Sequence, residues 1–218
     1  AMGCAANVKI CGDTVCIKQS GEDSGVRWYD YFDLGTNYRK IRNLLCIDDY
    51  MREASDYGAG IRILNQEKWE ALCSIIISQC NNIPRIKKIV EALCALYGEK
   101  LTFEGKEYHT FPSAERLATV TPDDLAPIRA GYRAPYIVDA AKAVASGEID
   151  LEKLSETTPE QARRTLKTIN GIGDKVANCA ILFSLHMTDA FPIDVWMKKA
   201  IAEHYGSGFD PKIFGKNA

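Results

Sequence analysis

The chain lacks several features that would place it in other classes of protein. Its 218 residues contain no run of about 18 apolar residues that could span a membrane, and its first residues lack the basic and apolar regions of a secretion signal. The 27 basic and 29 acidic side chains nearly balance, so the net charge of -2 gives no overall attraction for an anion. Basic side chains still gather locally, at Arg85, Lys87 and Lys88 and at Arg129, Arg133 and Lys142.

The eight cysteines also exclude several kinds of site. They include no Cys-x-x-Cys pair and no cluster spaced for zinc or an iron–sulfur centre. Most of them stand among apolar residues at helical spacing. We therefore expect reduced, buried thiols, as in cytoplasmic proteins, and no iron–sulfur cluster.

Hydrophobic periodicity predicts a mainly helical protein with a small β element at its start. Residues 8–17 alternate around Gly12 and Asp13, which predicts a two-residue hairpin with Val8, Ile10, Val15 and Ile17 on one face. After a polar break at residues 20–25, apolar residues recur mostly at the 3.6-residue period of helices.

The periodicity also suggests how the chain is divided. Residues 100–108 form a polar excursion between helices, and the last two predicted helices cover residues 175–185 and 194–205. We divide the chain into an N-terminal β-hairpin segment, residues 1–27, and a helical domain, residues 28–218.

A glycine hairpin at residues 169–173 is the most informative local pattern. Gly171 and Gly173 stand immediately before a predicted helix, and glycine permits positive φ and close approach of another backbone. The first amides of a helix are unpaired and lie at its positive end, where a DNA phosphate binds well. An ordinary tight turn is the simpler interpretation of the two glycines alone. The spacing of a nucleotide-hydrolase phosphate loop is missing.

Lys175 and Asp194 add groups that can carry out chemistry. Lys175 lies in the first turn of the predicted helix, where the dipole and burial favour a neutral amine. A neutral amine can attack the anomeric carbon of a sugar, displace a base and form a Schiff base, which favours β-elimination. Asp194 can cap the last helix or stabilise positive charge on the sugar ring. A solvated lysine and a plain cap are the simpler interpretations of each residue alone.

Taken together, these residues resemble the signature of the helix-hairpin-helix DNA glycosylase superfamily. Gly171, Gly173, Lys175, Pro192 and Asp194 match that signature in type, order and spacing. The resemblance implies the HhH-GPD fold, with two helical subdomains preceded by an antiparallel sheet. Only a hairpin of that sheet is expected here.

Within the superfamily, the chain is most similar to 8-oxoguanine glycosylases, from about residue 28 to residue 205. Residues 28–34 look like that family's entry into the helical domain. Residues 78–86 look like its DNA-probing segment, and residues 131–136 look like its wedge loop.

The resemblance assigns roles to individual residues. Lys175 is the Schiff-base nucleophile, Asp194 is the catalytic carboxylate, and Cys179, one helical turn after Lys175, packs against the flipped base. The residues expected to contact DNA are Cys80, Asn81, Asn82, Arg85, Tyr132, Arg133, Gly171, Gly173 and Trp196.

Six of these residues are expected to recognise the damaged pair. Arg85 and Arg133 would contact the cytosine left without a partner, and Tyr132 would wedge into the base stack. The family commonly has asparagine where Cys80 stands, as the residue that fills the space left by the flipped base. Asn81 and Asn82 would share that role.

The resemblance also implies partners and cofactors. The partner is double-stranded DNA with a damaged base, bound by a monomer in a bacterial-type cytoplasm, at the nucleoid. No organic cofactor is needed, and the backbone carbonyls of Ile169 and Ile172 would hold a structural potassium or sodium ion. The family continues with a helix that grips the oxidised base, and we expect this helix to be missing from the chain.

We therefore predict a bifunctional DNA glycosylase and abasic-site lyase of the 8-oxoguanine type. One alternative is an endonuclease III-like glycosylase, whose usual C-terminal four-cysteine motif is absent here. An alkyl-base glycosylase is disfavoured because it uses the aspartate without the lysine. A non-catalytic helix-hairpin-helix DNA-binding module is a third alternative, but it would need neither Lys175 nor Asp194.

Overall fold

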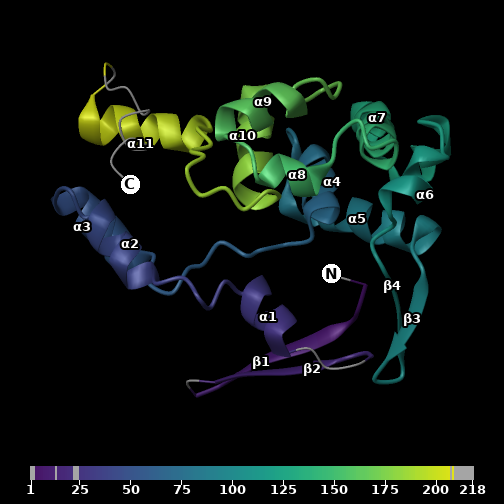
Figure 1. Ribbon diagram of the computed structural model, residues 1–218, viewed down its shortest axis with the longest axis horizontal. Coiled ribbons are helices and arrows are strands. Elements are labelled where there is room, and N and C mark those ends of the chain that lie inside the picture. The colour runs from purple at the N-terminus through teal and green to yellow at the C-terminus, as the bar shows by residue number, and fades with distance from the viewer. Residues whose placement is uncertain (1–2, 13, 22–24, 207, 209–218) are drawn as a thin grey trace.

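The protein is mainly helical, as the periodicity predicts (Figure 1). The computed structural model describes residues 3–12, 14–21, 25–206 and 208, with only the backbone of residues 25 and 26. The predicted turn residue Asp13 and the segment 209–218 lie outside the described residues. Within them, no helix is both long and apolar enough to cross a bilayer.

The elements follow one another along the chain with short connections. They are β1 (Ala6–Cys11), β2 (Thr14–Gln19), α1 (Gly25–Tyr31), α2 (Tyr38–Leu45), α3 (Asp49–Tyr57), α4 (Lys68–Ser78), α5 (Ile83–Tyr97), β3 (Lys100–Phe103), β4 (Lys106–His109), α6 (Ala114–Ala118), the 3-10 helices η1 (Asp123–Ile128) and η2 (Gly131–Arg133), α7 (Ala134–Ala145), α8 (Leu151–Ser155), α9 (Pro159–Leu166), α10 (Asp174–Phe183) and α11 (Val195–Tyr205). The last two predicted helices are confirmed, with their ends within two residues of the prediction.

The predicted N-terminal hairpin is confirmed. β1 and β2 pair antiparallel, with Val8 opposite Ile17 and Ile10 opposite Val15. Since side chains alternate between the two faces of a strand, these four apolar residues share one face. The register is the one that the alternating pattern predicts.

A second hairpin occupies the segment predicted to be a polar excursion. β3 and β4 pair antiparallel around Glu104 and Gly105, which both have positive φ, at +50° and +73°. Two positive φ values in a two-residue loop are typical of the turns that match the twist of a hairpin. The Lys18 ammonium lies 2.8 Å from the Glu104 carboxylate and joins the two hairpins.

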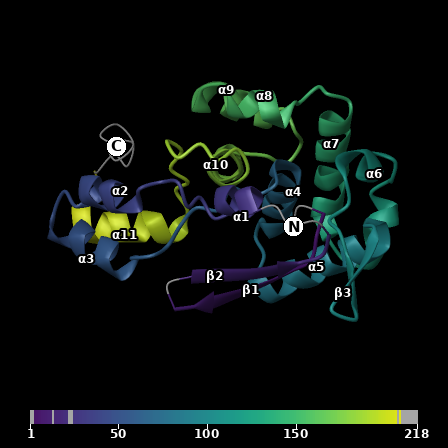
Figure 2. The ribbon, with the colours of Figure 1, turned by 60° about the horizontal axis from the view of Figure 1, so that its bottom comes forward.

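The helices from α4 to α10 share one apolar core. Helix α4 packs against α5, α7 and α10, and α10 also packs against α9 (Figures 1 and 2). The side chains with no exposed surface include Leu72, Ile76, Ile77, Leu93, Leu117, Leu125, Ile137, Leu166 and Ile181. Because α10 packs against α4 and α9, its first turn, which carries Lys175, is held in place by the core.

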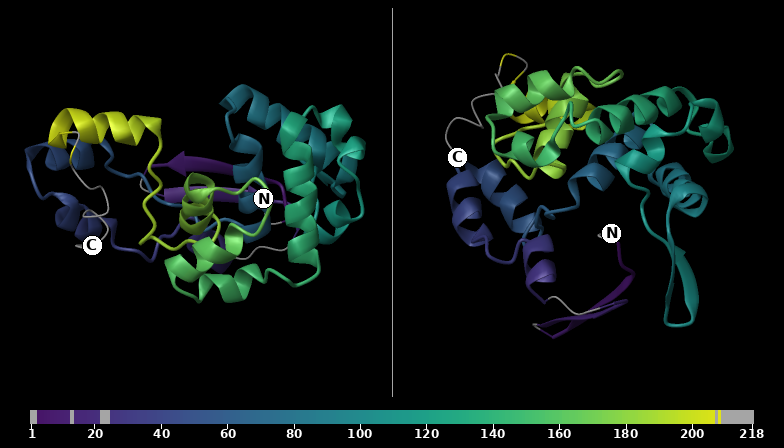
Figure 3. Two further views of the ribbon diagram at one scale, coloured as in Figure 1. Left: turned by 90° about the horizontal axis from the view of Figure 1, so that it is seen from above. Right: turned by 45° about the vertical axis from the view of Figure 1, so that its right-hand side comes forward.

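Helix α11 lies beside α2 and α3 and forms a second, smaller group (Figure 3). The Tyr205 hydroxyl donates to the Asp48 carboxylate at 2.8 Å, and the rings of Tyr50 and His204 stack with centroids 3.6 Å apart. Desolvation and the Asp48 carboxylate raise the pKa of Tyr205 to about 12. These contacts hold the helix whose first residue follows Asp194.

Gly98 provides a test of packing where α5 ends. Its φ of -82° suits any residue, but an added Cβ would lie 1.9 Å from the Thr110 carbonyl oxygen and 2.7 Å from that of Cys94. We expect Gly98→Ala to lower the free energy of unfolding by about 1–3 kcal/mol, the usual cost of overpacking. Urea unfolding measures this change. Gly173→Ala is the comparison variant, since its added Cβ meets no atom within 4 Å beyond its chain neighbours and only the preference of an N-cap for glycine over alanine is lost. A loss of stability in Gly98→Ala no larger than in Gly173→Ala would contradict the prediction.

Candidate active site

The glycine hairpin is a tight turn anchored by two buried isoleucines. The Ile172 amide donates to the Ile169 carbonyl at 3.2 Å, and both side chains lie in the core. Gly171 has φ of +81°, and a Cβ there would lie 2.3–2.5 Å from three ring atoms of Tyr136. Gly171 is therefore required for both its conformation and its lack of a side chain.

Gly173 has a different role in the same hairpin. It is the N-cap of α10, with ordinary backbone angles, and no side chain caps this helix. The acidic side chain of the first turn, Asp174, pairs with Lys167 at 2.7 Å, and Lys167 lowers the pKa of the Asp174 carboxyl. The exposed helix end is thus left open to an anion such as a phosphate.

We expect Gly173→Ala to weaken DNA binding about tenfold in a protein that still folds. The added methyl group would occupy the space through which a phosphate approaches the first amides of α10. Fluorescence anisotropy with an undamaged duplex at fixed salt measures the affinity. Thr102→Ala, exposed on β3, is the control, and an unchanged affinity of Gly173→Ala would contradict a phosphate site at this helix end.

The Cys179 thiol interacts electrostatically with both Lys175 and Asp194. Burial, the largest effect, raises the pKa of the Cys179 thiol, Lys175 lowers that pKa through its charge and a hydrogen bond, and Asp194 raises it. Ion pairs within the described residues include neither Lys175 nor Asp194. An exposed amine, a half-buried thiol and a carboxylate therefore share one site without a salt bridge that would hold the amine.

Asp194 is at the same time a helix cap. Its carboxylate accepts a hydrogen bond of 2.8 Å from the Met197 amide at the start of α11. Trp196 follows in the first turn with 75% of its surface exposed, and the Lys199 ammonium lies 4.9 Å from the centre of its ring. A large exposed aromatic side chain next to a cation is suited to contact with nucleic acid.

Arg133 is buried, although the sequence groups it with Arg129 and Lys142 in a basic cluster. It is only 2% exposed, and its guanidinium donates to the Gln79 carbonyl at 2.8 Å, to Cys80 at 3.0 Å and to Ala130 at 3.2 Å. It therefore fastens the wedge loop to the DNA-probing segment. The expected contact of Arg133 with cytosine stays a prediction, and it would require these hydrogen bonds to be exchanged.

Tyr132, by contrast, is available at the surface. It is 51% exposed, and its hydroxyl donates to the Gln79 carbonyl at 3.2 Å. Its ring faces the Arg133 guanidinium at 4.4 Å. The wedge role predicted for Tyr132 is compatible with this position.

The side chains of the DNA-probing segment, residues 78–86, shape the loop through hydrogen bonds, and several of them are exposed. Asn82 caps α5 by accepting from the Arg85 amide at 3.0 Å, and Asn81 donates to the Ile77 carbonyl at 3.0 Å. The Arg85 guanidinium donates to the Arg129 carbonyl at 3.1 Å. Cys80 is exposed, with φ of +46°, which is unusual for a residue other than glycine. Cys80, Asn82 and Arg85 all lie at the surface, where DNA can reach them.

The cysteines correct one expectation. All eight are free, but only Cys73 is buried, whereas Cys11, Cys16 and Cys80 are exposed. The first two lie on a two-stranded hairpin, whose outer face has no layer to cover it. Within the part of the chain that the structure describes, no group of three or more His, Cys, Asp or Glu side chains is placed to hold a metal ion.

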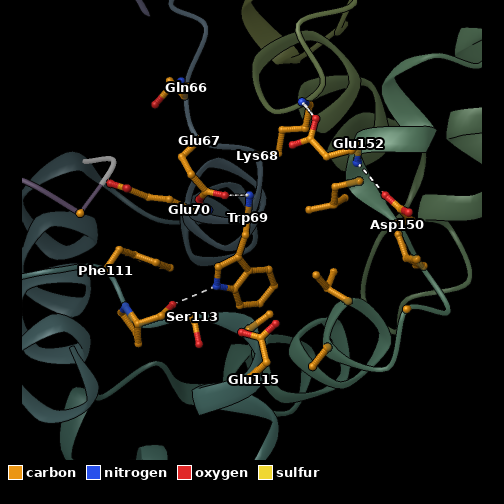
Figure 4. A pocket seen from close by; sticks show the side chains of 18 of the residues that line it. Gln66, Glu67, Lys68, Trp69, Glu70, Phe111, Ser113, Glu115, Asp150 and Glu152 are labelled. Atoms are coloured by element: carbon orange, nitrogen blue, oxygen red, sulfur yellow. Dashed lines mark hydrogen bonds and ion pairs between the residues drawn. The ribbon is translucent and has the colours of Figure 1, made fainter. Parts of the chain in front are cut away.

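A pocket of about 1030 Å³ lies elsewhere and contains none of the predicted site residues (Figure 4). Three of its acidic side chains are used within the fold. Glu67 caps α4, Asp150 caps α8, and Glu152 pairs with Lys68. Because these carboxylates serve helix starts, the pocket is a place where helix ends meet and does not suit an anionic ligand.

Comparison with known families agrees with this geometry. Residues 73–213 match the model of the HhH-GPD superfamily base excision DNA repair proteins. The chain belongs to this superfamily. Residues 11–72 of this HhH-GPD protein match the model of the N-terminal domain of 8-oxoguanine DNA glycosylase. The first match ends at residue 72, and the second begins at residue 73. The division predicted at residues 27 and 28 stays a prediction.

Relatives of this HhH-GPD protein include repair enzymes of known structure. The chain is 34% identical to the N-glycosylase/DNA lyase of Saccharomyces cerevisiae, over 80% of the chain and 50% of the relative. It is similar to the Clostridium acetobutylicum 8-oxoguanine glycosylase/lyase in complex with double-stranded DNA containing cytosine opposite 8-oxoguanine. That match has a TM-score of 0.88 and 35% identity, over 97% of the chain and 73% of the relative.

A second structure, MBOgg1 in complex with a low-affinity DNA ligand, matches with a TM-score of 0.88 and 44% identity. It covers 95% of the chain and 72% of the relative. The chain spans about half the length of the curated relatives it matches.

Tyr136 is a residue of this site that the sequence pattern does not show. The sequence places it in the wedge loop and at the start of a helix, without a contact. The contact with Gly171 depends on a turn 35 positions later in the chain, and no local pattern indicates it.

Proposed function

We propose that this protein excises 8-oxoguanine from duplex DNA and then nicks the abasic site through a lysine Schiff base. One observation carries the proposal. Lys175 lies in the first turn of α10, and both it and Asp194 act on the pKa of the same thiol, Cys179. A DNA-binding module without chemistry would need neither group. The relatives named as 8-oxoguanine glycosylase/lyases support this substrate.

The geometry suggests how the residues divide the work. The first amides of α10 hold a phosphate of the damaged strand, and the exposed ring of Tyr132 fills the space left by a flipped nucleotide. The pKa of the Cys179 thiol responds to both the amine and the carboxylate, and a flipped base would contact this half-buried thiol. The Asp194 carboxylate stabilises the positive charge that develops on the sugar.

Lys175 supplies the covalent chemistry. The Lys175 amine attacks C1′ through its nitrogen lone pair, the bond from C1′ to the base breaks, and the base leaves with a proton from the amine. Loss of the second amine proton and opening of the sugar ring give the imine. Removal of a proton from C2′ then expels the 3′ phosphate, and water hydrolyses the imine to regenerate the lysine.

We also propose a potassium or sodium ion at the glycine hairpin and no organic cofactor. Carbonyl oxygens are ligands suited to such hard cations, and Ile169 and Ile172 each contribute one. The Ile169 oxygen already accepts one hydrogen bond, from the Ile172 amide, and keeps a second lone pair. The ion would hold the hairpin in shape and would add positive charge beside the phosphate.

The proposed partner is double-stranded DNA with a damaged base, bound by a monomer. We place the protein in a bacterial-type cytoplasm at the nucleoid, where this substrate is found.

Borohydride trapping with a set of labelled duplexes tests the proposed function. The full chain is incubated with duplexes that contain 8-oxoguanine opposite cytosine, thymine glycol, a bare abasic site or no damage. We expect a covalent adduct with 8-oxoguanine and with the abasic site. An adduct with thymine glycol but not with 8-oxoguanine would indicate an endonuclease III-like enzyme, and binding without any adduct would indicate a non-catalytic module. Either result would overturn the proposal.

A further inference from the structure

We propose that Tyr136 is a positioning residue that couples the glycine hairpin to the wedge loop and the DNA-probing segment. Phosphate binding at the hairpin and base flipping at the wedge would then depend on one another. The inference rests on the proposed function, and it adds a residue to which neither the sequence motifs nor the matches assign a role.

The first contact joins Tyr136 to the hairpin. The ring lies where a side chain of Gly171 would otherwise stand, with three ring atoms 2.3–2.5 Å from the position of a Cβ. Tyr136 is half-buried and packs against the shared core. Because the ring packs directly against the backbone of Gly171, the hairpin has little room to move toward α7.

The second contact joins Tyr136 to the wedge. The rings of Tyr136 and Tyr132 meet edge to face, with centroids 6.0 Å apart and planes at 69°. The Arg133 guanidinium covers the Tyr132 ring and also holds the Gln79 and Cys80 carbonyls. The contacts therefore run without a break from the hairpin to the DNA-probing segment.

This route is specific to the aromatic ring. Among the hydrogen bonds of the described residues, none joins residues 169–173 to residues 131–136. Within the described residues, the Tyr136 ring therefore links the two segments by packing and not through a hydrogen bond. Removing the ring should therefore uncouple phosphate binding at the glycine hairpin from base flipping at the wedge loop.

We expect Tyr136→Leu to reduce excision of 8-oxoguanine from a duplex roughly 5- to 100-fold, the range of typical coupling between two sites. Cleavage of a single-stranded abasic oligonucleotide, which needs no flipping, should stay within about twofold of wild type. Tyr136→Phe keeps the ring and should behave as wild type. Tyr108→Leu, on exposed β4, is the matched control for loss of a tyrosine.

A second readout needs no activity. Hydrogen exchange of the free protein should become faster in residues 79–82 of Tyr136→Leu, but not of Tyr136→Phe or Tyr108→Leu. If Tyr136→Leu does not fold, Tyr136→Met replaces it with a side chain of similar reach and no ring.

The outcomes separate the two proposals. Equal loss of activity on duplex and single-stranded substrates, or unchanged exchange in residues 79–82, would overturn the coupling. If wild type itself forms no adduct with any substrate, the proposed function fails. The exchange experiment would still decide whether the hairpin and the DNA-probing segment are linked.

Discussion

Lys175→Gln is expected to abolish the covalent adduct and to lower the rate of strand cleavage by a factor of about 1000 or more, as loss of a nucleophile typically does. Glutamine keeps a polar side chain of similar reach but has no amine that can attack C1′. The lysine is exposed, and no ion pair within the described residues includes it. Stability should therefore change by no more than about 0.5 kcal/mol.

Three measurements check this result. Borohydride trapping reports the adduct, thermal unfolding reports stability, and anisotropy reports DNA affinity. Lys106→Gln, exposed in β4, removes a lysine far along the chain from the site and should retain full activity. A persistent adduct in Lys175→Gln would mean that another amine is the nucleophile.

The same variant tests the geometry even without substrate. The Lys175 charge lowers the pKa of the Cys179 thiol, so its removal should raise that pKa. Less thiolate is then present at pH 8, and alkylation of Cys179 by iodoacetamide should become slower. Mass spectrometry of the peptide with Cys179 distinguishes this thiol from the other seven. An unchanged rate would show that the amine does not lie at the thiol.

The sequence predicted the parts of the site that depend on local chemistry. Glycines one residue apart, a lysine two residues later and an aspartate before a helix are local signals, and the structure confirms the hairpin and both helices. The reason for each glycine was not predictable. Gly171 requires positive φ and meets a ring, whereas Gly173 has ordinary angles and lies at an open helix end.

Features set by distant contacts were not predictable in the same way. Arg133 reads as one member of a basic cluster, yet it is buried because carbonyls 53 and 54 residues earlier accept its hydrogen bonds. The β3–β4 hairpin was missed because its strands are short and mostly polar, and Glu104 is an uncommon residue for positive φ. Helical periodicity likewise cannot show that the cysteines of a two-stranded hairpin stay exposed.

Asp194→Asn is expected to reduce excision about 100-fold or more while leaving the fold unchanged, because the residue combines two roles that asparagine separates. As a helix cap, Asp194 accepts from the Met197 amide, and asparagine caps a helix about as well as aspartate. As a carboxylate, it stabilises positive charge on the sugar, and a neutral amide cannot replace that charge. Losses of this size are typical when one electrostatic group is removed from a transition state.

Comparison with Asp194→Ala makes the distinction measurable. Alanine removes both the cap and the charge, so the free energy of unfolding should fall by about 1 kcal/mol, whereas asparagine should leave it unchanged. Excision should be lost to a similar extent in both variants. Asp194 also raises the pKa of Cys179, so alkylation of that thiol should become faster in Asp194→Asn, opposite to its change in Lys175→Gln. If Asp194→Asn excises 8-oxoguanine at the wild-type rate, the residue is only a cap, and the charge that assists Lys175 must come from another group.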